Sequence, residues 1–178
     1  YAAKSFSGTY DPKVLETLTT AFTDAIVEAY GALAPAALAH GSARVPEYIR
    51  NRTRDAAVDD HLDWLVLRRE DGAQCRVVRY SAHPTVLSGR NMAFSADFPG
   101  YLQRAIERDA GGFAMYLGGA LGSMGHSAPD GPDGFARAAA MGEALAKRVL
   151  EGSADAPFEA AVEVATIGVP VSPPPMQL

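Results

Sequence analysis

The chain has 178 residues, of which 48% are hydrophobic and 21% charged, and its formal net charge is −5 at pH 7. This length and apolar content suit one folded domain and exclude an intrinsically disordered chain. The acidic balance and the scattered Lys and Arg residues give no basic surface, so we expect no nucleic-acid partner. A single cysteine, Cys75, excludes an internal disulfide framework and a CxxC metal knuckle.

The first predicted element is an amphipathic helix over residues 11–30. Asp11 and Pro12 form a favourable helix start, with an N-cap carboxylate followed by proline at the first helical position. Apolar residues then recur at helical spacing, and we expect this stripe to pack in the core: Val14, Leu15, Leu18, Phe22, Ile26 and Ala29. Residues 36–43 predict a short strand. The polar stretch 46–60 predicts a solvated loop, or alternatively one that aims an arginine into a cleft.

A hairpin is predicted next. The segments 63–70 and 73–83 flank Asp71-Gly72, a dipeptide typical of tight hairpin turns. The run 64–67 is apolar on both faces, which favours an inner strand covered by helices. His83 is then expected at the end of the second strand.

The remaining chain alternates between helices and strands. A helix is predicted from Phe98 to about Asp109, a buried strand over 113–117, a helix over 134–150, and a final strand over 158–171. Between them lies a glycine-rich loop, Gly118 to Gly125, that lacks the spacing of a phosphate loop. The alternation predicts a layered α/β domain with a mixed β-sheet flanked by helices.

The segment from Ser81 to Tyr101 carries the chemistry that we single out. His83 follows an apolar strand and precedes a proline, and polar residues where a strand ends are typical of ligand sites in α/β proteins. A lone histidine at a strand end is more often structural than a ligand. Asp97 is either the N-cap of the following helix or a side chain that orients a metal-bound histidine. Ser123 and Ser127 are candidate nucleophiles near glycine amides, or residues of a flexible connection.

Five motifs in order resemble the neutral/alkaline, non-lysosomal ceramidase family across residues 11–171. They are Asn51-Arg52-Thr53, the Asp71-Gly72 hairpin, residues 80–85 (YSAHPT), residues 95–101 (SADFPGY), and a strand that enters residues 118–122 (GGALG). The resemblance implies a zinc amidase that hydrolyses the N-acyl bond of ceramide or a related lipid amide. It implies that His83 is a ligand of Zn²⁺ and that Arg52 faces the active site.

The glycine loop departs from this family. The resemblance places a serine that acts at the zinc where this chain has Gly125, unless a three-residue shift aligns Ser127 instead. Ser123 and Ser127 stay the candidate catalytic serines. A divergent or noncatalytic binding protein that keeps the fold is therefore the alternative to an enzyme. A serine hydrolase without metal is a third interpretation, although the chain lacks the GxSxG elbow.

The two ends of the chain suggest a piece of a longer protein. It begins at Tyr1 without methionine, and no histidine, glutamate or tyrosine in it matches the other zinc ligands that the resemblance implies. We expect residues 1–178 to form a single α/β domain, part of a larger catalytic domain. The resemblance also suggests a secreted or periplasmic protein that contacts membrane lipid peripherally.

Overall fold

The computed structural model describes residues 9–163, 165–170 and 172. The chain divides into two compact units, Tyr1–Pro35 and Ala36–Leu178, which are described separately. No helix in the described part of the chain is long and apolar enough to cross a membrane. The expectation of a single domain within a larger one stays a prediction.

The described residues of the first unit contain one helix, α2 (Pro12–Gly31), as the sequence predicts. Its N-cap is Asp11, whose carboxylate accepts a hydrogen bond from the Lys13 amide at 2.9 Å. None of the residues of α2 is buried. The core packing expected for its apolar stripe is therefore not found within the described residues of this unit.

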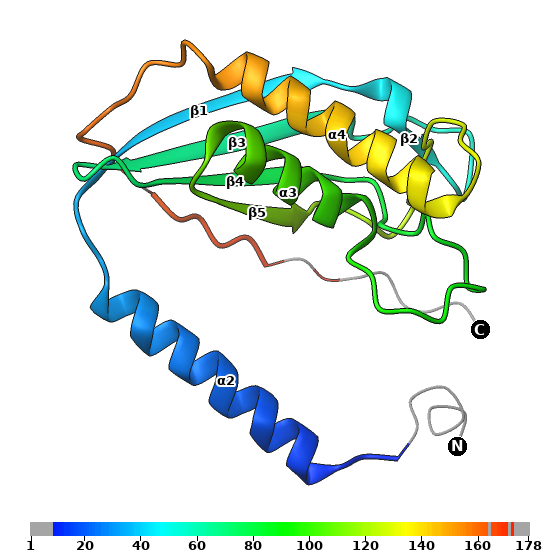
Figure 1. The fold of residues 1–178 in the computed structure, drawn as a ribbon, viewed down its shortest axis with the longest axis horizontal. Helices are drawn as coiled ribbons and strands as arrows, with labels where there is room; N and C mark the ends of the chain where they lie inside the picture. Colours follow the sequence, from blue (N-terminus) through cyan, green and yellow to red (C-terminus); the bar gives the residue numbers. More distant parts are fainter. Residues whose placement is uncertain (1–8, 164, 171, 173–178) are drawn as a thin grey trace. The chain divides into compact units, whose positions relative to one another are not determined.

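The second unit is built on a four-stranded mixed sheet with the strand order β1-β3-β4-β5 (Figure 1). Strands β1 (Ala36–Arg44), β3 (His61–Arg69) and β4 (Gln74–Tyr80) are antiparallel, and β5 (Phe113–Gly118) pairs in parallel with β4. Gly72 has a φ of +86° in the β3–β4 turn, a conformation that favours glycine. The α/β class, the mixed sheet and the hairpin are confirmed.

Two helices, α3 (Asp97–Ala110) and α4 (Gly134–Ser153), cover one face of this sheet (Figure 1). They approach each other closely at Gly142, where an added Cβ would lie 2.5 Å from the Phe98 carbonyl oxygen. Between helices and sheet lies the apolar core, whose largest members are fully buried: Tyr80, Phe98, Leu62, Leu102, Ile106, Met141 and Leu145. Side chains alternate between the two faces of a strand, so burial of apolar residues under the helices fixes which face of each strand points to the core.

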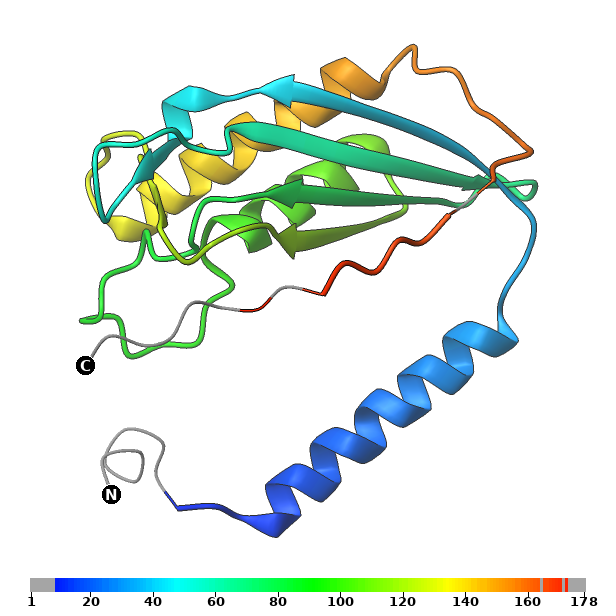
Figure 2. The ribbon, with the colours of Figure 1, turned by 180° about the vertical axis from the view of Figure 1, so that it is seen from behind.

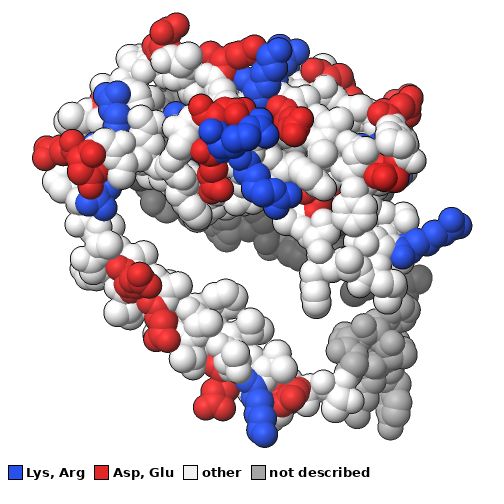
Figure 3. All heavy atoms as spheres, viewed as in Figure 1, with Lys and Arg blue, Asp and Glu red and all other residues white. Residues whose placement is uncertain are grey.

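Among the described residues of this unit, no helix lies on the opposite face of the sheet (Figure 2). Its apolar side chains are partly exposed, with Leu65 at 41% and Leu117 at 48%. The sequence correctly predicts β3 as an inner strand, but within this unit helices cover only one of its two faces. Over the helical face, acidic and basic side chains are interspersed (Figure 3).

Two short strands were not predicted. β2 (Ile49–Asn51) and β6 (Met124–His126) form a separate antiparallel pair, preceded by a 3₁₀ turn over Pro46–Tyr48. Conversely, the strand expected over 158–171 is wrong for the described residues. Only Glu159 bridges to Leu38 of β1, and the other described residues of that segment are not in a strand. Alternation of valine with polar residues indicates a strand only where a neighbouring edge is available.

Candidate functional site

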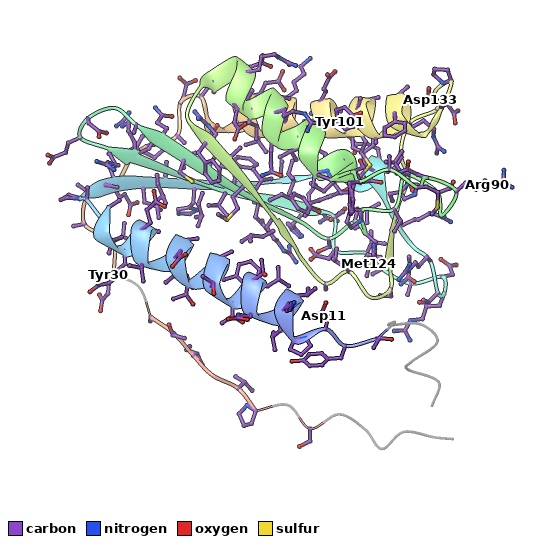
Figure 4. The ribbon with its side chains drawn as sticks, turned by 60° about the horizontal axis from the view of Figure 1, so that its bottom comes forward. Asp11, Tyr30, Arg90, Tyr101, Met124 and Asp133 are labelled. Carbon is purple, nitrogen blue, oxygen red and sulfur yellow. The ribbon has the colours of Figure 1, made fainter. Side chains whose placement is uncertain are left out.

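Three segments that are distant in sequence meet at β6. The main-chain amide of Arg52 donates to the Ser123 carbonyl at 2.9 Å, and the amide of His83 donates to the adjacent Met124 carbonyl at 3.2 Å. The Ser127 amide donates to the Tyr48 carbonyl at 2.9 Å. Figure 4 shows Met124, Arg90 and Asp133 toward the same end of the second unit. The structure thus brings together the polypeptide around Arg52, His83 and the two serines, and we call this region the β6 corner.

The glycine-rich loop is fixed where it leaves β5. The Gly119 amide donates to the Tyr80 carbonyl at 3.1 Å, so the loop continues the pairing of β4 and β5. A side chain at Gly119 would collide with the Ser81 hydroxyl and lie 2.8 Å from the Arg79 guanidinium. Glycine is therefore required at position 119 because the neighbouring side chains leave no space for a Cβ, and not because the loop needs conformational freedom.

Asp59 holds this part of the β6 corner together electrostatically. Its carboxylate forms an ion pair with Arg79 and accepts a hydrogen bond from the Ser81 hydroxyl at 2.7 Å. Arg79 also donates to Asp63 at 3.0 Å. The hydrogen bond from Arg79 is the main cause that lowers the pKa of Asp59 to about 2, against the opposing effect of burial. Sequence reasoning missed Asp59, because an aspartate in a polar loop gives no signal of its partner.

Arg52 is bound to the glycine loop by its side chain as well as its main chain. Its Nε and Nη2 donate to the Gly122 carbonyl at 3.3 and 3.0 Å. Asn51 shapes the same turn, since its side-chain oxygen accepts from the amides of Thr53 and Arg54. Arg52 is exposed, so the rest of its guanidinium faces solvent and can contact a ligand. The interpretation of 46–60 as only a solvated loop is wrong, because β2 and Arg52 form part of the β6 corner.

His83 lies three residues beyond the end of β4 rather than within the strand. It is partly buried, and its Nδ1 is buried without a hydrogen-bond partner among the described residues. Such an imidazole nitrogen needs a donor, an acceptor or a metal ion to offset its desolvation. Across residues 9–163, 165–170 and 172, no three His, Cys, Asp or Glu side chains are placed to hold a metal ion. His83 thus suits zinc as one ligand, but the described residues do not complete a zinc site.

Asp97 anchors the loop that follows His83. It is 6% exposed, and its carboxylate accepts from the Leu87 amide at 2.8 Å and from the Phe98 amide at 2.7 Å. Its own amide donates to the Ser95 hydroxyl at 3.0 Å, and its φ is +52°. Asp97 is the first residue of α3, one position after the N-cap, so its carboxylate serves backbone amides at the helix start. No hydrogen bond in the described chain joins it to His83.

The two candidate serines take part in the β6 corner through their main chains: the Ser123 carbonyl accepts a hydrogen bond and the Ser127 amide donates one. Neither hydroxyl is hydrogen-bonded to a histidine within the described residues. Both serines are partly buried. Gly125 is buried between them, and a Cβ added there would make ordinary contacts with Arg52, the nearest at 3.4 Å. The site therefore has room for a small side chain at Gly125. A histidine-activated serine is absent from the described part of the chain.

His126 is a further member of the β6 corner. Its Nδ1 accepts from the Ala128 amide at 3.2 Å. Burial lowers its pKa, while hydrogen bonding to the Thr85 backbone and the charge of Asp97 act in the opposite direction. The imidazole therefore links β6 to the segment that follows His83. Its place is set by the pairing of β2 with β6, which the sequence did not reveal.

Comparison with known proteins bears on the fold. No family model matches the chain, and no curated protein matches it. Among solved structures, the chain is similar to neutral ceramidase from Pseudomonas aeruginosa at 21% identity and a TM-score of 0.63, over 73% of this chain and 24% of that one. A second structure, described as a ceramidase complexed with C2, matches at 19% identity and a TM-score of 0.59, over 68% and 22%.

These similarities show that the chain has the fold of part of a ceramidase structure. The chain spans about a quarter of the length of the structures that it matches. The resemblance stated from the five motifs is therefore confirmed at the level of fold. The roles of individual residues stay predictions.

The ion pair of Asp59 gives a pH-dependent prediction. Because its pKa is lowered from about 3.9 in the unfolded chain to about 2, it stabilises the fold above the unfolded value and this effect disappears as pH falls through about 2. We expect Asp59→Asn to lower the free energy of unfolding by about 1–2 kcal/mol at pH 7, after allowance for solvent screening. The difference should fall to about half by pH 3.

Urea denaturation at pH 7 and at pH 3 measures both values. Asp55→Asn, an exposed aspartate in the same loop, is the matched control and should change neither. An equal loss for Asp59→Asn at both pH values would contradict the electrostatic explanation.

Proposed function

We propose that this chain is part of a zinc-dependent amidohydrolase that cleaves the N-acyl amide bond of ceramide or a related lipid amide. The observation that carries the proposal is the β6 corner, where Arg52, His83 and the glycine loop are tied together by main-chain hydrogen bonds. These are the segments whose motifs carry the resemblance to ceramidases, and they meet although 70 residues separate Arg52 from Gly122. The ceramidase-like fold supports the same proposal.

His83 supplies one ligand in this proposal, and the remaining ligands come from residues beyond those described. Zinc, when bound, polarises a carbonyl and lowers the pKa of a bound water toward about 7. The part of His83 in this chain is to present an imidazole whose main chain is fixed by the Met124 carbonyl. The part of Asp97 is to hold the loop after His83 through the Leu87 amide.

Arg52 has two functions in the proposed reaction. Its Nε and Nη2 hold the Gly122 carbonyl, which fixes the glycine loop. The exposed remainder of the guanidinium stabilises negative charge on the substrate or on the oxyanion that forms when the amide is attacked. The substrate would be drawn from lipid, so we also propose peripheral contact with a membrane surface and a secreted or periplasmic location.

Gly125 favours a second candidate, a noncatalytic or divergent ceramidase-like binding protein. In the resemblance, a serine that acts at the zinc occupies this position. Neither Ser123 nor Ser127 has a histidine partner in the described residues, so neither replaces it by an obvious activating contact. A protein that keeps the β6 corner without a nucleophile would bind lipid amides without cleaving them.

The zinc proposal is tested by the metal content of the full-length protein. We expect about one zinc ion per chain in the wild type and at least a tenfold weaker affinity in His83→Ala, because a ligand to the metal is lost. His40→Ala is the control, since His40 is an exposed histidine on β1. Atomic emission after equilibration with a zinc buffer measures the difference. Equal zinc content in both variants would remove His83 from the ligand set.

Activity separates the two candidate functions. For an amidohydrolase, we expect hydrolysis of an N-acyl lipid amide by the full-length protein and a loss of about 10²–10³ in kcat/KM for Arg52→Ala, with Arg54→Ala as the exposed neighbouring control. Ser123→Ala and Ser127→Ala identify any serine that takes part. If the wild type is inactive and still binds the lipid amide, the binding-protein candidate is correct. Gain of hydrolysis in Gly125→Ser would then show which group is missing.

A further inference from the structure

A cavity lies at the opposite end of the sheet from the β6 corner. Its volume is about 280 Å³. Strands β3 and β4, the C-terminal ends of α3 and α4, and the segment after α4 enclose it, and Figure 1 shows both helix ends toward the β3–β4 turn. Two arginines line it and none of its described lining residues is acidic: Val66, Arg68, Gln74, Arg76, Ala110, Leu150, Ser153, Ala154 and Phe158. We call this cavity the arginine pocket.

Arg76 enters the pocket from the middle of the sheet. It lies on β4, an inner strand, between Val66 of β3 and Ala114 of β5. Its Nε and Nη1 are buried and have no hydrogen-bond partner among the described residues. Burial lowers the pKa of Arg76, Cys75 acts in the opposite direction, and no carboxylate of the described residues does so. Arg76 as a whole is partly buried, but N–H donors that are buried without an acceptor are costly, so these two indicate a group that supplies acceptor oxygens.

Arg68 places a second cation at the same cavity. Its guanidinium lies 3.7 Å from the centre of the Phe158 ring, in a cation–π contact. Phe158 is held there by the neighbouring bridge, in which Glu159 and Leu38 exchange two main-chain hydrogen bonds of 2.8 and 2.9 Å. Arg68 is therefore kept near the pocket without a carboxylate partner among the described residues.

The C-terminal ends of α3 and α4 carry partial negative charge and favour cations nearby. This explains part of the attraction for two arginines. It does not satisfy Arg76, because no carbonyl of either helix accepts a hydrogen bond from its Nε or Nη1 within the described chain. The N–H groups of a guanidinium are strong hydrogen-bond donors to the oxygens of a carboxylate or phosphate.

We propose that the arginine pocket is an oxyanion-binding site, in which Arg76 is the main residue that binds the anion and Arg68 is the second. The occupant is a carboxylate or phosphate group whose oxygen accepts a hydrogen bond from Arg76 and whose negative charge neutralises the guanidinium. The site is independent of the proposed amidohydrolase activity, because it lies at the opposite end of β4 from His83. Its failure would therefore leave that proposal unchanged.

Thermal unfolding in sodium phosphate tests the site, with sodium chloride at the same ionic strength as reference. At tenfold the dissociation constant, we expect the melting temperature of the wild type to rise by roughly 3–6 °C. Arg76→Gln should lose this rise and, without phosphate, be no less stable than wild type, because buried N–H groups without an acceptor are removed. Arg69→Gln is the matched control, since Arg69 is also on β3 but pairs with Asp71 outside the pocket, and it should keep the full rise.

Sodium acetate in place of phosphate distinguishes the two sources of the oxyanion. A saturable rise with acetate alone assigns a carboxylate, and a rise with phosphate alone assigns a phosphate. If Arg76→Gln fails to fold, the Nε–H resonance of Arg76 in the wild type should shift saturably with the anion, and Arg68→Gln should weaken that binding. No saturable response to either anion, or the same response in wild type and Arg76→Gln, would overturn the proposal.

Discussion

The β6 corner depends on two consecutive carbonyl groups. The carbonyls of Ser123 and Met124 accept hydrogen bonds from the amides of Arg52 and His83, so the chain at the start of β6 fixes two segments that are distant in sequence. Because these bonds use the main chain, they do not depend on the side chain at either position. The corner can therefore keep its geometry while its chemistry changes, as the glycine at position 125 illustrates. The fold can therefore be kept while the function changes, because the main chain holds the corner and the side chains supply the chemistry.

Much of the fold could be predicted from local patterns. The Asp71-Gly72 turn, the apolar periodicity of α3 and α4, and the run of β5 specify their elements with little help from the rest of the chain. The pair β2–β6 could not be predicted, because each strand has only three residues and exists through a partner 70 or more residues away. The strand expected after α4 also depends on a partner that local sequence does not reveal. Among its described residues, only Glu159 pairs with another strand, at Leu38 of β1.

The candidate site was predicted in part. Sequence order placed Arg52, His83 and the glycine loop in one list of motifs, and the structure brings their main chains together. Asp59 and His126 were missed because their importance lies in partners, Arg79 and Thr85, that no local spacing reveals. The arginine pocket was also invisible, since nothing in the sequence shows that Arg76 is buried without a carboxylate.

Charge is treated differently at the two ends of the sheet. Arg79, which lies beside the glycine loop, is neutralised by ion pairs with Asp59 and Asp63. Arg76, three residues earlier on the same strand, points to the opposite face and has no such partner in the described chain. β4 thus carries one guanidinium that is paired with carboxylates, Arg79, and one whose Nε and Nη1 have no acceptor in the described chain, Arg76. Only Arg76 therefore indicates a bound ligand.

Amide hydrogen exchange tests the central claim, that main-chain bonds to β6 assemble the corner. The amides of Arg52, His83 and Ser127 donate to carbonyls across the corner, so they should exchange at least about tenfold more slowly than the amide of Gly89 in the exposed loop. Protection of all three to a similar degree is the result that the account predicts. Exchange of the Arg52 and His83 amides as fast as that of Gly89 would contradict it.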